Sequence, residues 1–244
     1  MAIIFSPLAN EEMTGAFKPL PGCAFVMIHS AASITPVELE IERQTRFALR
    51  QNGFRTVKAA GTFGTKDYLD KILQLIRGCG FGIAVFSEFT PPRTLANIFF
   101  EIGICYVLGK DVILIKTPNA AIPSDFVRNE WVEFKPAPTR SFVRSMSAAC
   151  RAVRRSAAFY SKLGQLALAE DAHDLELAFE RFKQAALIVN DPHVRAQIRQ
   201  VSAQLAVLSR ESVEARNHFK RLKGEVDRFL KLYPRRGRTV GTSA

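Results

Sequence analysis

Short apolar runs alternate with longer amphipathic segments through the first half of the chain. Continuous apolar runs of five or so residues are typical of strands that are buried on both faces of a parallel sheet. They predict strands over Ala24–Ile28, Phe54–Ala59, Phe81–Phe86, Asp111–Ile115 and Trp131–Phe134, after a lead-in over residues 1–22. Helical spacing between the runs predicts helices capped by Thr35, Thr65 and Thr94, and a short helix over Pro123–Arg128. Glu38 stands three residues after Thr35, at the position that completes a capping box. We therefore expect an α/β domain over residues 23–137 with a five-stranded parallel, flavodoxin-like sheet.

The pattern beyond the proline-containing segment 135–138 is helical throughout. It predicts helices over 140–155, 157–170, 174–189, 193–208 and 211–232, which form an association module over 138–234, followed by a basic disordered tail over 235–244. Small and aromatic positions between Tyr160 and Pro192 resemble one tetratricopeptide repeat with a loop of about two residues between its helices. Gly164 and Ala178 would let the paired helices approach closely. Any antiparallel hairpin with a seam of small residues would give the same pattern.

The charge divides with the elements. Residues 1–137 carry 14 Lys and Arg against 13 Asp and Glu, whereas residues 138–244 carry 20 against 10. A basic module can meet nucleic acid, a membrane surface or an acidic partner, or its charge can serve only as a solvated face. One expected helix concentrates this charge in Lys220, Arg221, Lys223, Arg228 and Lys231. Phe229 lies on the apolar side of this helix, and no exposed aromatic residues for base stacking are interleaved with the cations. We therefore expect protein docking or self-association, and only weak, nonspecific nucleic-acid binding.

Composition excludes several classes of protein. The 48% of hydrophobic residues, with 19 Phe, are ample for a core, so the chain is not disordered overall. The longest apolar stretch is interrupted by Glu101 and is too short for a membrane span, and no basic residue precedes the short apolar patch at the N-terminus as in a signal peptide. Widely spaced cysteines read as free thiols in a reducing compartment. We expect a cytoplasmic protein without a membrane partner.

Candidate binding residues follow from the topology. In open parallel sheets, ligands bind beyond the carboxyl ends of the strands. The residues at or after these strand ends are therefore candidates for substrate binding, through side chain or backbone: His29, Ser30, Gly61, Ser87, Glu88 and Asn97. The glycines near Lys110 and Cys79 precede their strands, so neither makes a phosphate loop or a dinucleotide fingerprint, and the histidines have no metal-ligand spacing. No metal and no resident cofactor are expected.

Glu101 is the most informative residue. It lies in the middle of an apolar helix, where the positions three and four residues away are Asn97, Ile98, Ile104 and Cys105. Burying an unpaired carboxylate costs several kcal/mol in rough terms, so such a residue persists where something repays the cost. Two explanations for a buried Glu101 stay open: a catalytic role near the expected cleft, or a structural hydrogen bond to a loop or a partner subunit.

The segment Asn97–Ile115, NIFFEIGICYVLGKDVILI, resembles the signature of bacterial Toll/interleukin-1-receptor-like (TIR-like) nucleotide-binding domains and of the related nucleoside 2-deoxyribosyltransferases. The first strand ending in His29-Ser30 and the segment Ile122–Phe126 agree with that pattern. The resemblance covers about residues 23–135. It implies that Glu101 is the catalytic carboxylate that attacks or stabilises the anomeric carbon as an N-glycosidic bond breaks.

This resemblance implies an NAD(+) glycohydrolase in bacterial antiviral defence or signalling, with NAD as substrate and with activation by assembly. Departing nicotinamide is neutral, so one carboxylate is enough to stabilise the oxocarbenium-like charge. Two alternatives stay open: a nucleotide-sensing module without turnover, and a deoxyribosyltransferase-like salvage enzyme. Deoxyribosyltransferases typically carry an Asp where this chain has Ser87-Glu88, which disfavours the second alternative.

Overall fold

The computed structural model describes residues 5–6, 11–12, 17–29, 34–59, 68–122, 130–136, 139–169, 174–211 and 216–233. Its centre is a five-stranded, all-parallel sheet. The strands are β3 (Leu20–Met27), β4 (Arg55–Val57), β5 (Cys79–Phe86), β6 (Val112–Lys116) and β7 (Trp131–Glu133). They lie in the order β4-β3-β5-β6-β7, which is the 2-1-3-4-5 order of flavodoxin-like sheets. The expected five-stranded parallel sheet is confirmed. Two short strands, β1 (Phe5–Ser6) and β2 (Glu11–Glu12), form an antiparallel ribbon.

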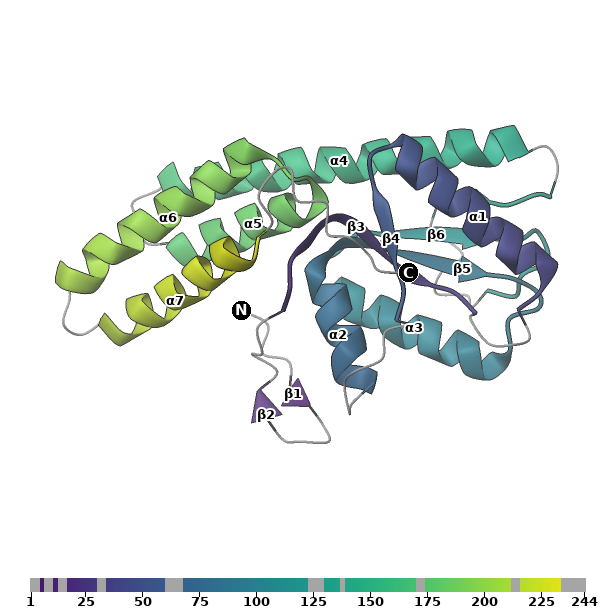
Figure 1. Cartoon of the computed structure of the whole chain (residues 1–244), viewed down its shortest axis with the longest axis horizontal. Helices are drawn as coiled ribbons and strands as arrows, with labels where there is room; N and C mark the ends of the chain where they lie inside the picture. Colours follow the sequence, from purple (N-terminus) through teal and green to yellow (C-terminus); the bar gives the residue numbers. More distant parts are fainter. Residues whose placement is uncertain are drawn as a thin grey trace.

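Helices cover both faces of this sheet (Figure 1). Alternate residues of β3 divide between two cores: Ala24 and Val26 contribute to one, and Phe25 and Met27 to the other. The first core is closed by α1 (Pro36–Gln51) and by the first half of α4 (Thr139–Ala169). The second is closed by α2 (Tyr68–Gly78) and α3 (Pro92–Val107). Burial on both faces explains why the strands read as continuous apolar runs.

The expected capping box of α1 is present. The Thr35 hydroxyl accepts a hydrogen bond from the Glu38 backbone N–H at 3.3 Å, and the Glu38 carboxylate accepts one from the Thr35 N–H at 3.0 Å. Proline at the first helical position adds a φ angle that is already helical. The local sequence therefore fixes the start of α1 beyond the end of β3.

The helical region differs from the expectation in one respect. The two helices predicted over 140–155 and 157–170 are a single helix, α4, of 31 residues. The predicted break was wrong because Ser156 is followed by alanines, and neither glycine nor proline interrupts the helix between Thr139 and Tyr160. Then follow α5 (Leu175–Ile188), α6 (Pro192–Glu211) and α7 (Arg216–Leu232), close to their predicted positions.

The seam between α4 and α5 is tight at Gly164. A Cβ atom at this position would lie 2.6 Å from the ring of the buried Phe182. Residues 170–174 separate the two helices, which is longer than the loop of about two residues that a tetratricopeptide-like hairpin predicts. The structure thus shows a close helix pair, and the repeat itself stays a prediction.

The helical region joins the sheet at the amino ends of its strands. A Cβ atom at Gly80, near the start of β5, would lie 2.6 Å from the Leu187 carbonyl oxygen of α5. The Tyr160 hydroxyl of α4 donates to the Gly109 carbonyl at 3.3 Å, next to the partly buried Lys110. The first core includes residues on both sides of the expected boundary at 137/138, so one apolar interior crosses that position.

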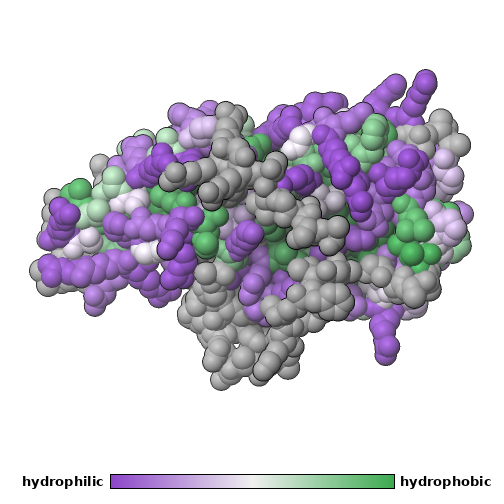
Figure 2. All heavy atoms as spheres, viewed as in Figure 1, coloured by the Kyte–Doolittle hydropathy of each residue, from purple (hydrophilic) through white to green (hydrophobic). Residues whose placement is uncertain are grey.

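The surface is mostly polar on the side shown in Figure 2, with smaller groups of apolar residues. None of the described helices is long and apolar enough to cross a membrane. The four cysteines are buried and unpaired, as expected of free thiols. The expected short helix over Pro123–Arg128 and the tail over 235–244 lie outside the described residues.

Candidate functional site

A cavity of about 410 Å³ opens beyond the carboxyl ends of β3 and β4, between these strands and helices α2 and α3. Its volume lies within the range of about 300–1,000 Å³ that is usual for small-molecule sites. β3 and β5 are the neighbours at which the strand order reverses, so the cavity borders the switch point of the sheet. This is where the topology predicted a ligand.

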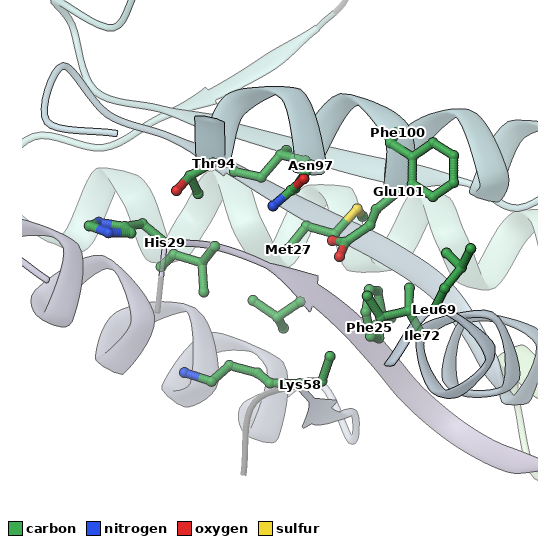
Figure 3. Close-up of a pocket in the computed structure, with 14 residues that line it drawn as sticks. Phe25, Met27, His29, Lys58, Leu69, Ile72, Thr94, Asn97, Phe100 and Glu101 are labelled. Atoms are coloured by element: carbon green, nitrogen blue, oxygen red, sulfur yellow. The ribbon is translucent and has the colours of Figure 1, made fainter. Parts of the chain in front are cut away.

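One part of the cavity is apolar and holds Glu101 (Figure 3). The buried face of α3 consists of Ile98, Ile102 and Cys105. Glu101 lies beside this face on the helix, and its side chain lines the cavity. Within the described residues, the Glu101 carboxylate has no hydrogen bond and no ion pair. Desolvation by burial raises its pKa from 4.5 to about 7. The carboxylate therefore faces a ligand-sized space without a protein partner.

The walls around Glu101 include apolar side chains from three elements. They are Phe25 and Met27 of β3, Leu69 and Ile72 of α2, and Phe100 of α3. Glu101 is partly buried and Phe100 is exposed, so these walls reduce the contact of the carboxylate with water without closing the cavity. A lower exposure to water strengthens the interaction of the carboxylate with a positive charge inside the cavity. An apolar wall also suits the flat face of an aromatic base.

Another part of the cavity is polar. It is lined by His29, Lys58, Thr94 and Asn97, and Figure 3 shows His29 and Thr94 away from the apolar residues of α2. The Lys58 ammonium is held by the Glu42 carboxylate of α1 at 2.8 Å. Donors and acceptors of this kind fix the orientation of a ligand, whereas the apolar part supplies contact area.

A buried hydrogen-bond network lies behind His29. The Glu38 carboxylate accepts hydrogen bonds from the Ser87 hydroxyl at 2.7 Å and the Thr90 hydroxyl at 3.3 Å, and it contacts Nδ1 of His29 at 3.3 Å. Burial acts to raise the pKa of Glu38, but the hydrogen bonds from Thr35, Ser87 and His29 together outweigh it and lower the pKa. Since an ionised carboxylate only accepts, Nδ1 of His29 is the donor in this pair. Glu38 thereby fixes the ring that lines the cavity.

The structure brings three of the candidate residues together and separates the others. Glu101, Asn97 and His29 line the same cavity. Ser87 does not line it and is held in the Glu38 network, whereas Glu88 accepts a hydrogen bond from Thr117 at the end of β6. Ser30 and Gly61 lie outside the described residues. Among the residues that are described, no cluster of His, Cys, Asp and Glu has the make-up of a metal site.

Sequence reasoning missed two residues of this region and misplaced a third. Lys58 follows β4 directly, so its position at a strand end was the available signal. Glu38 was identified only as a capping residue. Thr94 was expected to cap α3, but the helix begins at Pro92, with Pro91 as N-cap, because proline suits the first helical position. Thr94 is left to line the cavity.

The cavity is therefore an apolar pocket with a carboxylate on one side and polar groups on another. No protein-family model matches the chain, and a search of curated protein sequences finds no significantly similar relative. The function has to be inferred from the residues of the pocket.

Proposed function

We propose that this protein is an NAD(+) glycohydrolase of the TIR-like type, which cleaves the bond between nicotinamide and ribose. The observation that supports this proposal is the Glu101 carboxylate, which lies in an apolar pocket without a partner among the described residues. The resemblance of Asn97–Ile115 to that family suggests the bond that is cleaved.

The proposed chemistry needs one carboxylate. As the glycosidic bond breaks, its electron pair leaves with nicotinamide, which becomes neutral, and the ribose ring acquires oxocarbenium-like positive charge. Glu101 stabilises this charge or traps it as a covalent ester, and water completes the hydrolysis to ADP-ribose, nicotinamide and a proton. The apolar walls around Glu101 favour the step because charge interacts more strongly where water is excluded.

The polar part of the pocket supports the substrate side of the proposal. Thr94 and Asn97 offer hydrogen-bonding groups to ribose hydroxyls beside the buried His29 ring, and Lys58, whose charge is balanced by Glu42, lies near the same opening. The 410 Å³ of the cavity suits one end of a dinucleotide better than the whole of it. We propose that the remainder of NAD extends along the edge of the sheet.

Assembly through the C-terminal helices is part of the proposal. Leu177, Val207 and Leu232 are at least 40% exposed on α5, α6 and α7, which offers apolar contacts to another copy or to a protein partner. Antiviral defence or signalling, with activation by assembly, is suggested by the family resemblance. No resident cofactor is proposed, because NAD is the substrate.

The direct test is the release of nicotinamide from NAD by purified full-length protein, followed by chromatography. Glu101→Gln should lower the rate by roughly a thousandfold, about 4 kcal/mol, since the amide keeps the shape but not the charge. Glu133→Gln, an exposed carboxylate on β7 that pairs with Lys135, is the matched control and should keep wild-type activity.

Other outcomes distinguish the alternatives. NAD binding without turnover, measured by calorimetry, would favour a sensing module. Base released from deoxynucleosides but not from NAD would favour a transferase-like enzyme. Activity of Glu101→Gln within a few-fold of wild type would remove Glu101 from the mechanism.

A further inference from the structure

Helix α4 carries basic residues but no acidic ones over its whole length of 31 residues. Its cations are Arg140, Arg144, Arg151, Arg154, Arg155 and Lys162, and all six are exposed. With 3.6 residues per turn, these positions fall within about 100° of the helix circumference. They make one continuous stripe, here called the basic ridge, opposite the buried face of α4.

Most of this charge is not neutralised by the protein. Arg154 donates to the Asn52 carbonyl and its guanidinium lies 5.2 Å from the centre of the Phe54 ring, so it is anchored to the sheet domain. The other five cations have no hydrogen bond or ion pair with a described residue. Acidic groups on the neighbouring helices are engaged elsewhere: Glu42 of α1 pairs with Lys58, and Glu180 of α5 pairs with Lys183.

Helix α7, where the sequence suggested the main basic surface, is different. Arg221 lies 3.9 Å from Glu225, and Lys223 pairs with Asp227. Each pair joins residues four apart on the same helix, so the charge of α7 is partly balanced within it. Among the described residues, α4 therefore carries more cations without an acidic partner than α7, and it has no acidic residue of its own.

We propose that the basic ridge binds the phosphate backbone of a duplex nucleic acid without reading its sequence. The ridge extends from Arg140 to Lys162, 22 residue steps or about 33 Å at 1.5 Å per residue, which is close to one turn of a DNA duplex. A straight helix matches a stiff, straight polyanion along that length (Figure 1). Five of the six cations are arginines, whose guanidinium groups form paired hydrogen bonds with phosphate.

The residues between the cations favour a phosphate backbone over a protein partner. Within the arc they are Ser147, Ala158 and Gln165, so no large apolar side chain of the kind that anchors a protein interface lies among the cations. Ala148 and the exposed Leu166 lie at its edge, about 80° from Arg140 around the helix. The residues between the cations also disfavour a single-stranded nucleic acid, because its bases bind by stacking on aromatic residues. The exposed Phe159 lies outside the arc of the cations, about 100° from Arg140 around the helix.

The ridge and the pocket belong to different sides of the sheet. α4 packs with α1 in the first core, whereas Glu101 belongs to α3, which closes the second core. Binding at the ridge is therefore independent of the proposed NAD chemistry. Charge changes on the ridge should leave nicotinamide release unaffected.

The test is fluorescence anisotropy of a labelled 24-base-pair DNA duplex with the full-length protein at about 50 mM salt, where backbone contacts are strong. The variant Arg144→Glu/Arg151→Glu/Arg155→Glu should bind at least tenfold more weakly. Its plot of log affinity against log salt should be shallower by about 2 to 3, since each lost phosphate contact removes about 0.9. The control Lys220→Glu/Arg228→Glu/Lys231→Glu changes the net charge equally on α7 and should lose no more than about a third as much affinity.

Several results would overturn the proposal. They are no duplex binding at this salt concentration, equal losses for the α4 and α7 variants, and tighter binding to the single strand alone. Tighter binding of polyglutamate than of the duplex at equal charge would assign the ridge to an acidic protein instead. A second α4 variant, Arg144→Gln/Arg151→Gln/Arg155→Gln, serves as the folding control. If its thermal midpoint is unchanged while its affinity falls, the loss of binding is not a loss of folding.

Discussion

Ser87, at the end of β5, donates a hydrogen bond of 2.7 Å to the buried Glu38 carboxylate on α1. The two residues are 49 positions apart in sequence, and their contact links the end of β5 to the start of α1 beside the switch point. The Ser87 hydroxyl is thus occupied within the protein, whereas Asn97 and His29 line the cavity itself. We infer that the Glu38 network supports the pocket wall and that its loss would be felt first as a loss of stability.

Glu38→Gln should lower the free energy of unfolding by about 3 kcal/mol, because an amide in this place turns an NH₂ group toward donors and loses charge-assisted hydrogen bonds. Urea unfolding at pH 7 measures the change. Glu40→Gln is the control: Glu40 is partly exposed on the same helix and pairs with Arg43, so its loss should cost well under 1 kcal/mol. A loss below 1 kcal/mol for Glu38→Gln would show that the network contributes little.

The same network has a defined pH dependence. The pKa of Glu38 is lowered from 4.5 in the folded protein, so folding favours the carboxylate. Its stabilisation is fully present above pH 4.5 and is lost as the pH falls through the lower, folded value. Wild type and Glu38→Gln should therefore converge in stability toward strongly acidic pH.

NAD cleavage should fall below neutral pH. The pKa of Glu101 is raised to about 7, and the proposed mechanism needs the ionised carboxylate. The rate constant kcat/KM for nicotinamide release should therefore drop about tenfold between pH 8 and pH 6. A profile that is flat between these values would show either that Glu101 ionises well below pH 6 or that its charge is not used.

Ionisation of Glu101 should lower the stability of the folded protein, although the proposed catalysis needs it. The folded pKa of Glu101 lies above the unfolded value of 4.5, so ionisation favours the unfolded state as pH rises from about 4.5 to 7. Glu101→Gln removes that penalty and should stabilise the protein by about 1–3 kcal/mol at pH 8, with little effect at pH 4. Urea unfolding at both pH values makes each protein its own control. Equal stability of the two proteins at pH 8 would contradict a desolvated carboxylate.

Most strands of the sheet could be predicted from sequence because the patterns that indicate them lie within short segments. The strand residues Phe25 to Ile28 are buried on both faces, and the capping box at Thr35 needs only the next three residues. Glu101 was found for the same reason: a single charge within an apolar helix stands out against its own neighbours. The rules for crossover connections then leave only a handful of possible strand orders.

The rest depended on contacts that are distant in sequence. Glu38 and Ser87 meet only after the sheet forms, so the capping box gave no indication of the network. α4 packs along its length against the first core, which contains Ala157, and against a third core within the helical region, which contains Ala167, and its continuity depends on both. Local propensity around Ser156 does not tell one long helix from two short helices. The basic ridge follows from that continuity, since a break at 156 would have separated its cations.

The tight seam at Gly164 leads to the last prediction. Gly164→Ala would place a Cβ atom 2.6 Å from the Phe182 ring, which is fully buried. Alanine favours the helix by about 1 kcal/mol over glycine, but overpacking costs about 1–3 kcal/mol, so the variant should be destabilised overall. Gly224→Ala on α7 is the control: its Cβ atom would meet nothing within 4 Å, so it should gain stability by up to about 1 kcal/mol.

A double-mutant cycle measures whether the close contact is the cause. Phe182→Leu removes the outer ring atoms that the new Cβ would meet, and alone it should cost stability by leaving a void. Phe182→Leu combined with Gly164→Ala should recover part of the stability that the two single changes lose. The double variant should therefore be about 1 kcal/mol more stable than the sum of the single effects predicts. Thermal and urea unfolding of the four proteins give this coupling. Additive effects would place the cost of Gly164→Ala elsewhere in the helix pair, and the seam would then tolerate a methyl group by a small shift of α5.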